Sequence, residues 1–235
     1  MRIEKFETYA DMSVFIAELI ASQLLLKPDS VLGLATGSTP LGAYEHLVRL
    51  YNAGKVDFSK CVTFNLDEYY PISPDNPQSY HYYMRKNLFD YVNVPEKNIH
   101  IPDGSCGNPE EECLRYDELV EQYGGIDLQL LGLGENGHIG FNEPASKLDN
   151  KTHLTALTES TIEANSRFFS SADEVPRHAL TMGVGTILKS KKIIIAISGN
   201  KKLNAFHKML EGQIDTSSPA TLLNLHNDVI VAFNE

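Results

Sequence analysis

A histidine and a glutamate lie on a glycine-rich loop that follows the most hydrophobic segment of the chain. Residues 126–133 read as a buried strand, and the glycines after it let backbone amides approach a ligand. His138 and Glu143 are five positions apart, so the carboxylate can orient and charge the imidazole if the loop folds back. This pattern predicts a proton shuttle. A packed or surface histidine is the alternative, but the flanking glycines leave little side-chain volume around His138.

Two carboxylates follow a second apolar segment. Residues 61–66 read as a strand, and Asp67 and Glu68 come directly after it. Strand ends are where α/β enzymes keep much of their chemistry, and a carboxylate at such a place can act as a base. Either acid could equally cap the following turn, and the sequence leaves both interpretations open.

A candidate anion-binding loop occupies residues 35–40, between a predicted strand and a predicted helix. Thr36, Gly37, Ser38 and Thr39 precede a proline at the start of the helix. Free backbone amides at such a helix start can bind an anion. An ordinary N-cap, which Ser38 or Thr39 alone would satisfy, is an equal alternative.

Lysines lie at the first turn of another predicted helix, after an apolar run at residues 192–198. Lys201 and Lys202 follow Gly199 there. Cations at a helix N-terminus oppose the helix dipole unless an anion is bound between them and the amides, so the pattern indicates a phosphate. A solvated lysine pair is the alternative.

Residues 132–137 also match the dinucleotide-binding pattern GxGxxG. The chain then continues with Gly140 and Pro144, which break the helix that the pattern requires. No second strand ends in an acid about 20 residues later. We therefore expect no nicotinamide cofactor.

Apolar runs alternate with helical patterns along the whole chain. Buried strands are predicted at residues 31–35, 61–66, 126–133, 192–198 and 229–233. Apolar residues recur at helical spacing within residues 12–24, 41–51, 116–123 and 203–210. This alternation predicts an α/β fold with a doubly wound, mostly parallel, modified Rossmann-like sheet and helices on both faces.

Residues 1–235 are expected to form a single domain, because no linker, charge block or repeat divides them. The least periodic stretch runs from Asn142 to about Arg177. It predicts a mobile lid around residues 150–177 beside the candidate site. A surface excursion without a role is the alternative.

The charge balance excludes several kinds of partner. The chain has 20 Lys plus Arg against 31 Asp plus Glu, a formal charge of -11. Such a charge repels nucleic acid and anionic lipid, and no uninterrupted apolar run approaches the ~18 residues of a membrane span, so neither partner is expected. Cys61, Cys106 and Cys113 form no CxxC pair, which argues against disulfides and against a zinc site. We expect no metal, no targeting signal and a cytoplasmic location.

Taken in order, these segments resemble the motifs of the glucosamine-6-phosphate deaminase family, which forms a larger group with the 6-phosphogluconolactonases. The likeness covers nearly the whole chain, and several ordered matches are far more specific than any one of them. The matching segments are residues 36–40 (TGSTP), 65–69 (NLDEY), 137–144 (GHIGFNEP), 165–169 (NSRFF), 180–186 (LTMGVGT) and 199–202 (GNKK).

The resemblance implies that glucosamine 6-phosphate and water become fructose 6-phosphate and ammonia, without a metal or an organic cofactor. It implies that His138, held by Glu143, protonates the ring oxygen and that Asp67 moves the C2 proton to C1, after which water hydrolyses the imine. Asn136 is a second candidate for catalysis, and Glu68 is a candidate for binding the substrate. The implied phosphate site consists of Thr36, Gly37, Ser38, Thr39, Arg167 and Lys202.

Two features depart from the family pattern. Many members have an aspartate at the position of Asn136, so here an amide must orient without charge and Glu143 is expected to pair with His138. Larger, allosterically activated members have basic residues where this chain has His153 and Thr155. We therefore expect no activation by an acetylated amino sugar phosphate, and a monomer or a small homo-oligomer.

Two other functions are compatible with parts of the pattern. A 6-phosphogluconolactonase would use the same phosphate loop and histidine, but that group usually has small and hydroxyl residues leading to Leu-Phe-Pro where this chain has residues 141–144 (FNEP). A non-catalytic phosphosugar sensor would have no chemical reason to keep Asp67, His138 and Glu143 together. The resemblance therefore favours the deaminase.

Overall fold

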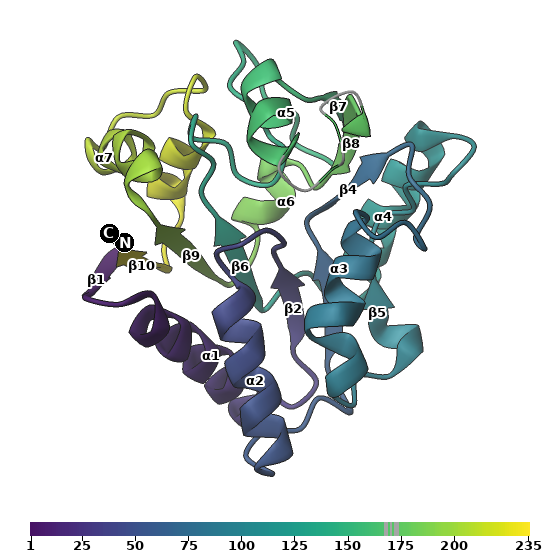
Figure 1. Cartoon of the computed structure of the whole chain (residues 1–235), viewed down its shortest axis with the longest axis vertical. Helices are drawn as coiled ribbons and strands as arrows, with labels where there is room; N and C mark the ends of the chain where they lie inside the picture. Colours follow the sequence, from purple (N-terminus) through teal and green to yellow (C-terminus); the bar gives the residue numbers. More distant parts are fainter. Residues whose placement is uncertain (167–168, 170, 172–173) are drawn as a thin grey trace.

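A seven-stranded parallel sheet forms the centre of the computed structural model, which describes residues 1–166, 169, 171 and 174–235 (Figure 1). Its strands are β1 (Arg2–Phe6), β2 (Val31–Leu34), β3 (Val62–Asn65), β5 (Ile99–His100), β6 (Leu128–Gly132), β9 (Lys192–Ser198) and β10 (Val229–Asn234). They are ordered β1-β10-β9-β6-β2-β3-β5, and every neighbouring pair is parallel. The five predicted strands are observed as β2, β3, β6, β9 and β10, and the predicted mostly parallel sheet is confirmed.

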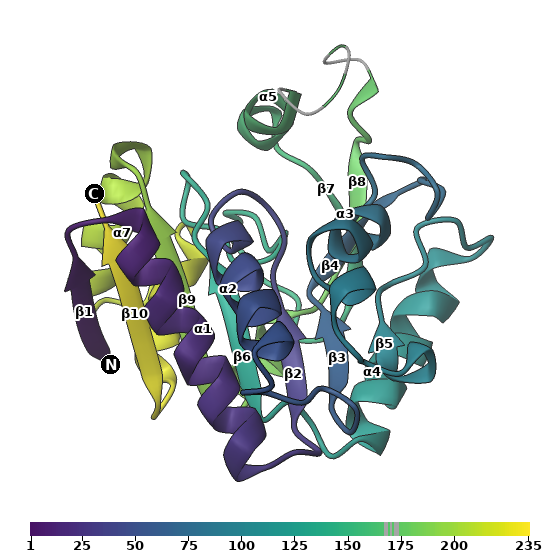
Figure 2. The same ribbon diagram turned by 60° about the horizontal axis from the view of Figure 1, so that its bottom comes forward.

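Helices flank this sheet on both sides. They are α1 (Tyr9–Leu26), α2 (Leu41–Asn52), α3 (Tyr80–Asn87), α4 (Pro109–Gln122), α5 (Glu159–Ser166), α6 (Val184–Leu188) and α7 (Leu203–Leu210), with 3₁₀ turns η1 (Phe89–Tyr91), η2 (Glu96–Asn98), η4 (Asn200–Lys202) and η5 (Pro219–Leu225). In Figure 2, α1 and α2 pack together in front of the sheet, and α7 lies behind it. The predicted helices are observed as α1, α2, α4 and α7.

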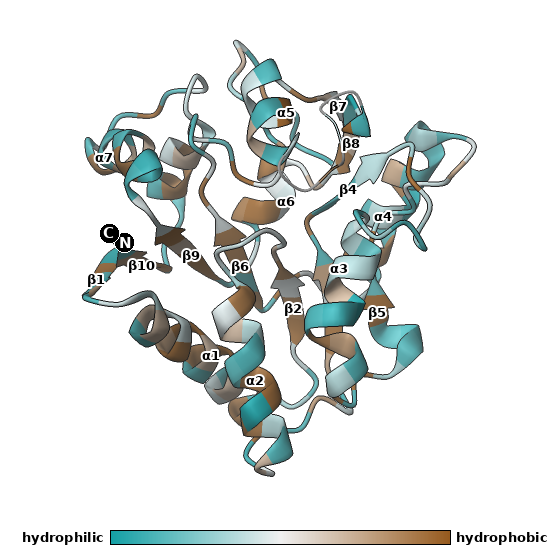
Figure 3. Ribbon diagram, viewed as in Figure 1, coloured by the Kyte–Doolittle hydropathy of each residue, from teal (hydrophilic) through white to brown (hydrophobic). Residues whose placement is uncertain are grey.

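Burial on both faces explains why the central strands are mostly apolar and do not alternate. All residues of β10 are buried, as are the five residues between the two ends of β9. In Figure 3 these strands are brown, whereas the helices carry both colours. A strand that helices cover on both faces needs a continuous apolar run, and an alternating pattern would leave polar groups in the core.

The first helix, α1, is the one described helix whose length and composition would allow it to cross a membrane. Its apolar side packs into the core instead: Met12, Ile16, Ile20 and Leu24 are buried, and α1 contacts α2 and β10. Thr8 caps its first turn by accepting the backbone N–H of Asp11 at 3.1 Å. In this fold α1 is a core helix.

A second, antiparallel sheet begins directly after β3 and was not predicted. It consists of β4 (Asp67–Tyr70), β8 (His178–Thr181) and β7 (His153–Ala156), in the order β4-β8-β7. Only Leu66 separates β3 from β4, so the chain passes from one sheet into the other at the carboxyl end of β3. A small apolar cluster that includes Tyr69, Phe141 and Ile162 packs under this sheet.

The predicted lid segment, residues 150–177, is not irregular, because its described part contains β7 and α5. Each was missed for the same reason: four largely half-buried residues in β7 and a short eight-residue helix give no clear period. The edge strand β1, whose residues are mostly exposed, and the two-residue β5 escaped prediction in the same way. Motion of the segment stays a prediction.

The order of the strands reverses between β2 and β6. From β2 the sheet continues through β3 to β5, whereas β6, β9 and β10 extend it on the other side. Loops that leave the carboxyl ends of β2 and β6 therefore diverge, and such a crevice is the usual ligand site of an open parallel sheet. These two loops carry residues 36–39 and His138.

Candidate active site

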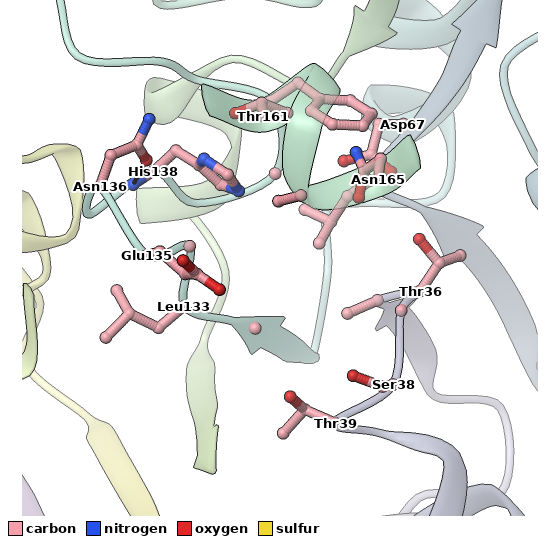
Figure 4. Close-up of a pocket in the computed structure, with 18 of the residues that line it drawn as sticks. Thr36, Ser38, Thr39, Asp67, Leu133, Glu135, Asn136, His138, Thr161 and Asn165 are labelled. Atoms are coloured by element: carbon pink, nitrogen blue, oxygen red, sulfur yellow. Dashed lines mark hydrogen bonds between the residues drawn. The ribbon is translucent and has the colours of Figure 1, made fainter. Parts of the chain in front are cut away.

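A cavity of about 390 Å³ occupies this crevice, a size typical of small-molecule sites (Figure 4). Side chains from four predicted loops and from α5 line it. The predicted residues among them are Thr36, Gly37, Ser38, Thr39, Asp67, Asn136, His138 and Lys202. Glu68 and Glu143 are not part of its lining, and Arg167 lies outside the described residues. The fold thus brings together residues that are far apart in the chain.

Asn136 and Glu143 hold the histidine in place. Oε2 of Glu143 lies 3.5 Å from Nδ1 of His138, within ion-pair distance but without the geometry of a hydrogen bond. The side-chain amide of Asn136 donates to the same Oε2 at 2.8 Å, and its side-chain oxygen accepts the backbone N–H of His138 at 3.2 Å. Gly134 leaves room for the ring, because a Cβ at that position would lie 2.4 Å from Nε2. Asn136 therefore positions both members of the pair without adding charge.

Glu143 is buried yet favours its charged form. Burial by itself raises its pKa, but the interaction with His138, together with hydrogen bonds from Thr161 and Asn136, outweighs burial and holds the pKa below its ordinary value. An anion therefore faces the imidazole at neutral pH. This is the environment that a proton-transferring histidine needs.

Asp67 lines the same cavity as His138 and comes from a different part of the chain (Figure 4). It is the first residue of β4, and only 6% of it is exposed. Burial, together with the negative charge of Glu68, raises the pKa of Asp67 to about 8. A carboxylate with such a pKa is a much stronger base than an exposed one, which suits it to removing a proton from carbon.

Glu68 does not line the cavity, so its predicted contact with the substrate is not what the structure shows. Its Oε1 accepts the backbone N–H groups of Tyr69 and Tyr80 at 2.9 and 2.8 Å, and its Oε2 accepts that of His81 at 2.9 Å. Burial raises its pKa to about 7 against the lowering effect of these amides. Glu68 thus binds the first backbone amides of α3, a helix distant in the chain and not the directly following turn, and it holds Tyr80 at the cavity wall.

Two tyrosines orient the loop that follows β2. The hydroxyl of Tyr83 donates to the carbonyl of Gly37 at 2.6 Å, and the hydroxyl of Tyr9 lies 3.2 and 3.1 Å from the carbonyls of Ser38 and Thr39. Gly37 has a positive φ of 92°, a conformation that favours glycine. With its carbonyls engaged by tyrosines, the loop can turn its amides toward the cavity.

The start of α2 has no side-chain cap from its own N-cap residue, which is Pro40. In its first turn the backbone N–H of Gly42 donates to the hydroxyl of Tyr9 at 2.8 Å. The alternative in which Ser38 or Thr39 acts as an ordinary N-cap is therefore wrong. A helix start without such a cap, beside the cavity, is suited to binding an anion.

Lys202 reaches the same loop from η4. Its Nζ donates to Oγ1 of Thr39 at 3.0 Å, which places an ammonium group beside the start of α2. The neighbouring Lys201 points elsewhere: its side chain is 82% exposed and lies 3.8 Å from Glu135. An ammonium group and a helix N-terminus that meet in this way favour an anion bound between them.

Several residues of the cavity wall were not predicted as site residues, among them residues with polar side chains from two helices. Tyr80 comes from α3, and Thr161 and Asn165 come from α5. No local pattern marks Tyr80 or Thr161, because their roles depend on partners far away in the chain. Asn165 falls in the segment 165–169 that carries the family resemblance, which was the only available signal.

Cofactor patterns find little support in the geometry. Residues 132–137 do not begin a helix, and the next regular element after β6 is β7, so the segment lacks the form of a dinucleotide-binding turn. In the part of the chain that the structure describes, no three His, Cys, Asp or Glu side chains are grouped closely enough to hold a metal ion. A reaction without metal stays a prediction.

Comparisons with known proteins all find the same family. The family model of glucosamine-6-phosphate isomerases and 6-phosphogluconolactonases matches residues 4–231. A protein of Thermoanaerobacter sp. named glucosamine-6-phosphate deaminase is 54% identical over 97% of this chain and 90% of its own length. One from Clostridium acetobutylicum with the same name is 54% identical over 100% of this chain and 98% of its own.

Solved structures give the same result. The structure of a monomeric glucosamine-6-phosphate deaminase is 46% identical, with a TM-score of 0.98, and covers 100% of this chain and 98% of that chain. The 6-phosphogluconolactonase from Thermotoga maritima is 25% identical, with a TM-score of 0.78, and covers 99% of this chain and 98% of that chain.

Proposed function

This chain belongs to the family of glucosamine-6-phosphate isomerases and 6-phosphogluconolactonases, and within it we propose that the protein is a glucosamine-6-phosphate deaminase. The enzyme converts glucosamine 6-phosphate and water to fructose 6-phosphate and ammonia, and so serves amino sugar metabolism. Relatives with that name share more than half of its residues over nearly the whole chain. The observation that carries the proposal is that Asp67 and His138 line one cavity, with the Glu143 carboxylate 3.5 Å from the His138 ring.

The anion-binding end of the cavity orients the sugar. We assign the phosphate to the amides and hydroxyls of residues 36–39 and to Lys202, because an ammonium group and the N-terminus of α2 meet there. Arg167 remains a predicted further ligand. A hexose 6-phosphate bound this way directs its C1 and C2 atoms toward Asp67 and His138.

Ring opening is assigned to His138. An imidazolium held by the Glu143 carboxylate donates its proton to the ring oxygen as the bond from that oxygen to C1 breaks. The C1 hydroxyl loses its proton to water and becomes the aldehyde. Asn136 holds the Glu143 carboxylate and the backbone of His138 in a fixed relative position during this transfer. The open-chain amino aldehyde is the substrate of the next step.

Isomerisation is assigned to Asp67. Its carboxylate removes the proton from C2 and returns it to C1, while a proton passes from the amine to the C1 oxygen. The amino aldehyde thereby becomes an imine at C2 with a hydroxyl at C1. Water adds to this imine and ammonia leaves, so that the overall reaction is a hydrolysis. A buried base whose pKa is about 8 matches the demand of proton removal from carbon better than an ordinary aspartate.

The nearest rival is a 6-phosphogluconolactonase, which would use the same phosphate site and histidine. Glu143 distinguishes the two functions. A deaminase needs a carboxylate that favours the protonated histidine for opening the sugar ring, whereas lactone hydrolysis has no such step. Purified protein should release ammonia and fructose 6-phosphate in equal amounts from glucosamine 6-phosphate, with or without a chelator. Hydrolysis of 6-phosphogluconolactone without ammonia release would reverse the assignment.

Lys202→Met is expected to raise KM for glucosamine 6-phosphate roughly thirtyfold while changing kcat less than about threefold, because a charge-assisted hydrogen bond to phosphate contributes mainly to binding. The matched control is Lys201→Met, since the neighbouring side chain is exposed and directed toward Glu135. Steady-state kinetics measure both. Equal effects of the two substitutions on KM would contradict the assigned phosphate site.

The protein is proposed to act as a monomer or small homo-oligomer in the cytoplasm, in line with its likeness to a monomeric relative. We also keep the expectation that an acetylated amino sugar phosphate does not activate it. Its rate should follow a hyperbola in substrate concentration with and without that ligand. Sigmoidal kinetics that the ligand makes hyperbolic would refute this expectation.

A further inference from the structure

The helix α5 reaches Glu143 through a hydroxyl group. Oγ1 of Thr161 donates to Oε1 of Glu143 at 2.5 Å, and both residues are buried. The other carboxylate oxygen, Oε2, faces His138 and Asn136. Among the described residues, Thr161 is thus the partner of the Glu143 side chain that does not belong to the loop after β6.

The start of α5 fixes the direction of this hydroxyl. Oγ1 of Thr158 donates to Oγ1 of Thr161 at 3.1 Å and accepts its backbone N–H at 3.3 Å. Ile162, the next residue, is buried in the small apolar cluster with Phe141. A hydroxyl that accepts one hydrogen bond donates a stronger one, so the chain from Thr158 through Thr161 to Glu143 is polarised toward the carboxylate.

Few charged groups in the described segments face Glu143, so the hydrogen bond from Thr161 has a clear influence on the pKa and the orientation of this carboxylate. The titratable group that faces Glu143 from its own loop is His138. The acids of α5, Glu159 and Glu163, are exposed, and Glu159 pairs with Arg177 at 3.2 Å. The hydrogen bond from Thr161 is one of the contacts that hold the pKa of Glu143 low. Removing it takes away both a partner and a constraint on orientation.

We propose that Thr161 is a positioning residue for ring opening, which holds Glu143 in the orientation that faces His138 and makes the pair complete only while α5 is seated over the cavity. This inference rests on the proposed deaminase function. Figure 4 shows Thr161 on the helix above the cavity, on the side where His138 lies. If α5 moves away, the hydrogen bond breaks and Glu143 loses its contact outside the loop. Proton donation by His138 is thereby linked to coverage of the bound sugar.

Thr161→Val tests this role, because it removes the hydroxyl and keeps the branched shape. It should lower kcat about tenfold, the loss expected for one hydrogen bond to a charged group. The inhibition constant of an open-chain analogue, 2-amino-2-deoxyglucitol 6-phosphate, should change less than about twofold, because the analogue needs no ring opening. Thr161→Ser should restore kcat. Thr155→Val on β7 is the matched control, since its hydroxyl contacts only the carbonyl of Ala156 at 3.4 Å among the bonds described.

A double-mutant cycle shows whether Thr161 acts through Glu143. In a Glu143→Gln background, Thr161→Val should lower kcat at most about threefold, because the charged acceptor is gone. The same tenfold loss in both backgrounds, or a rise in the analogue's inhibition constant that parallels the loss in kcat, would overturn the inference. Wild-type protein that releases no ammonia would instead overturn the proposed function, and the inference with it.

Discussion

Asp67→Asn is expected to lower kcat about a thousandfold and at the same time to stabilise the fold at neutral pH. The loss of rate follows because the amide cannot take the C2 proton, and a positioned general base contributes about 10²–10⁴ to a rate. The gain in stability follows because asparagine has the same shape and no charge to bury. Activity and stability therefore change in opposite directions at one position.

The pKa of Asp67 determines how the stability gained by Asp67→Asn depends on pH. Burial and the charge of Glu68 raise the pKa of Asp67 from 3.8 to about 8 on folding. Its protonated form therefore stabilises the native state fully below pH 3.8, and that contribution is lost as pH rises through about 8. The advantage of Asp67→Asn should be absent near pH 3.5 and grow to a few kcal/mol, at order-of-magnitude precision, near pH 8.

Asp127→Asn is the matched control, because it replaces a buried aspartate of the opposite kind. Burial favours a higher pKa there, but hydrogen bonds from Lys191, Lys27 and the backbone of Val31, at 2.7, 2.9 and 2.8 Å, lower it below 3.8. Its ionised form stabilises the fold above the unfolded pKa, so Asp127→Asn should destabilise at neutral pH and leave kcat unchanged. Urea unfolding at several pH values measures both variants. Destabilisation of the Asp67→Asn protein at pH 7 would contradict the account.

His138→Gln is expected to lower kcat about a hundredfold, less than Asp67→Asn, because sugars also open without catalysis at a slow rate. Ring opening should then limit the rate. A substrate with deuterium at C2 should therefore show a smaller isotope effect in the variant than in the wild type. His207→Gln is the control, since His207 is exposed on α7.

An unchanged or larger deuterium isotope effect in the His138→Gln protein would mean that proton removal at C2 still limits the rate. His138 would then act in isomerisation, and the division of labour between His138 and Asp67 would be wrong. Together with the Thr161 variants, this measurement assigns each side chain to a particular step.

The central sheet was predictable because its strands are covered on both faces. Residues 193–197, within the predicted strand 192–198, are all apolar. Such a run is typical of a fully buried strand or helix, and its short length favours a strand. The second sheet was not predictable in this way. In β4, two carboxylates and two tyrosines take the place of an apolar pattern, and their pairing with β8 joins residues more than a hundred positions apart.

The site was predictable where its residues form a recognisable local sequence pattern. Glycines beside His138 and hydroxyls before Pro40 are unusual near strand ends, and the reversal of strand order brings those loops together. Glu68 shows the limit: its sequence context is identical for a turn cap and for a ligand-binding acid. Only the folded structure distinguishes them, because there the backbone N–H groups of Tyr80 and His81 donate to the Glu68 carboxylate. Thr161 likewise has no local mark, because its partner lies 18 positions away across a cavity.

The central claim is that residues distant in the chain surround one hexose 6-phosphate in a fixed orientation. A crystal structure with 2-amino-2-deoxyglucitol 6-phosphate tests it most directly. We predict the phosphate on residues 36–39 and Lys202, C2 nearest the carboxylate of Asp67, and the C1 end beside His138. A reversed ligand, with its phosphate against His138 and its amine at Lys202, would contradict the account.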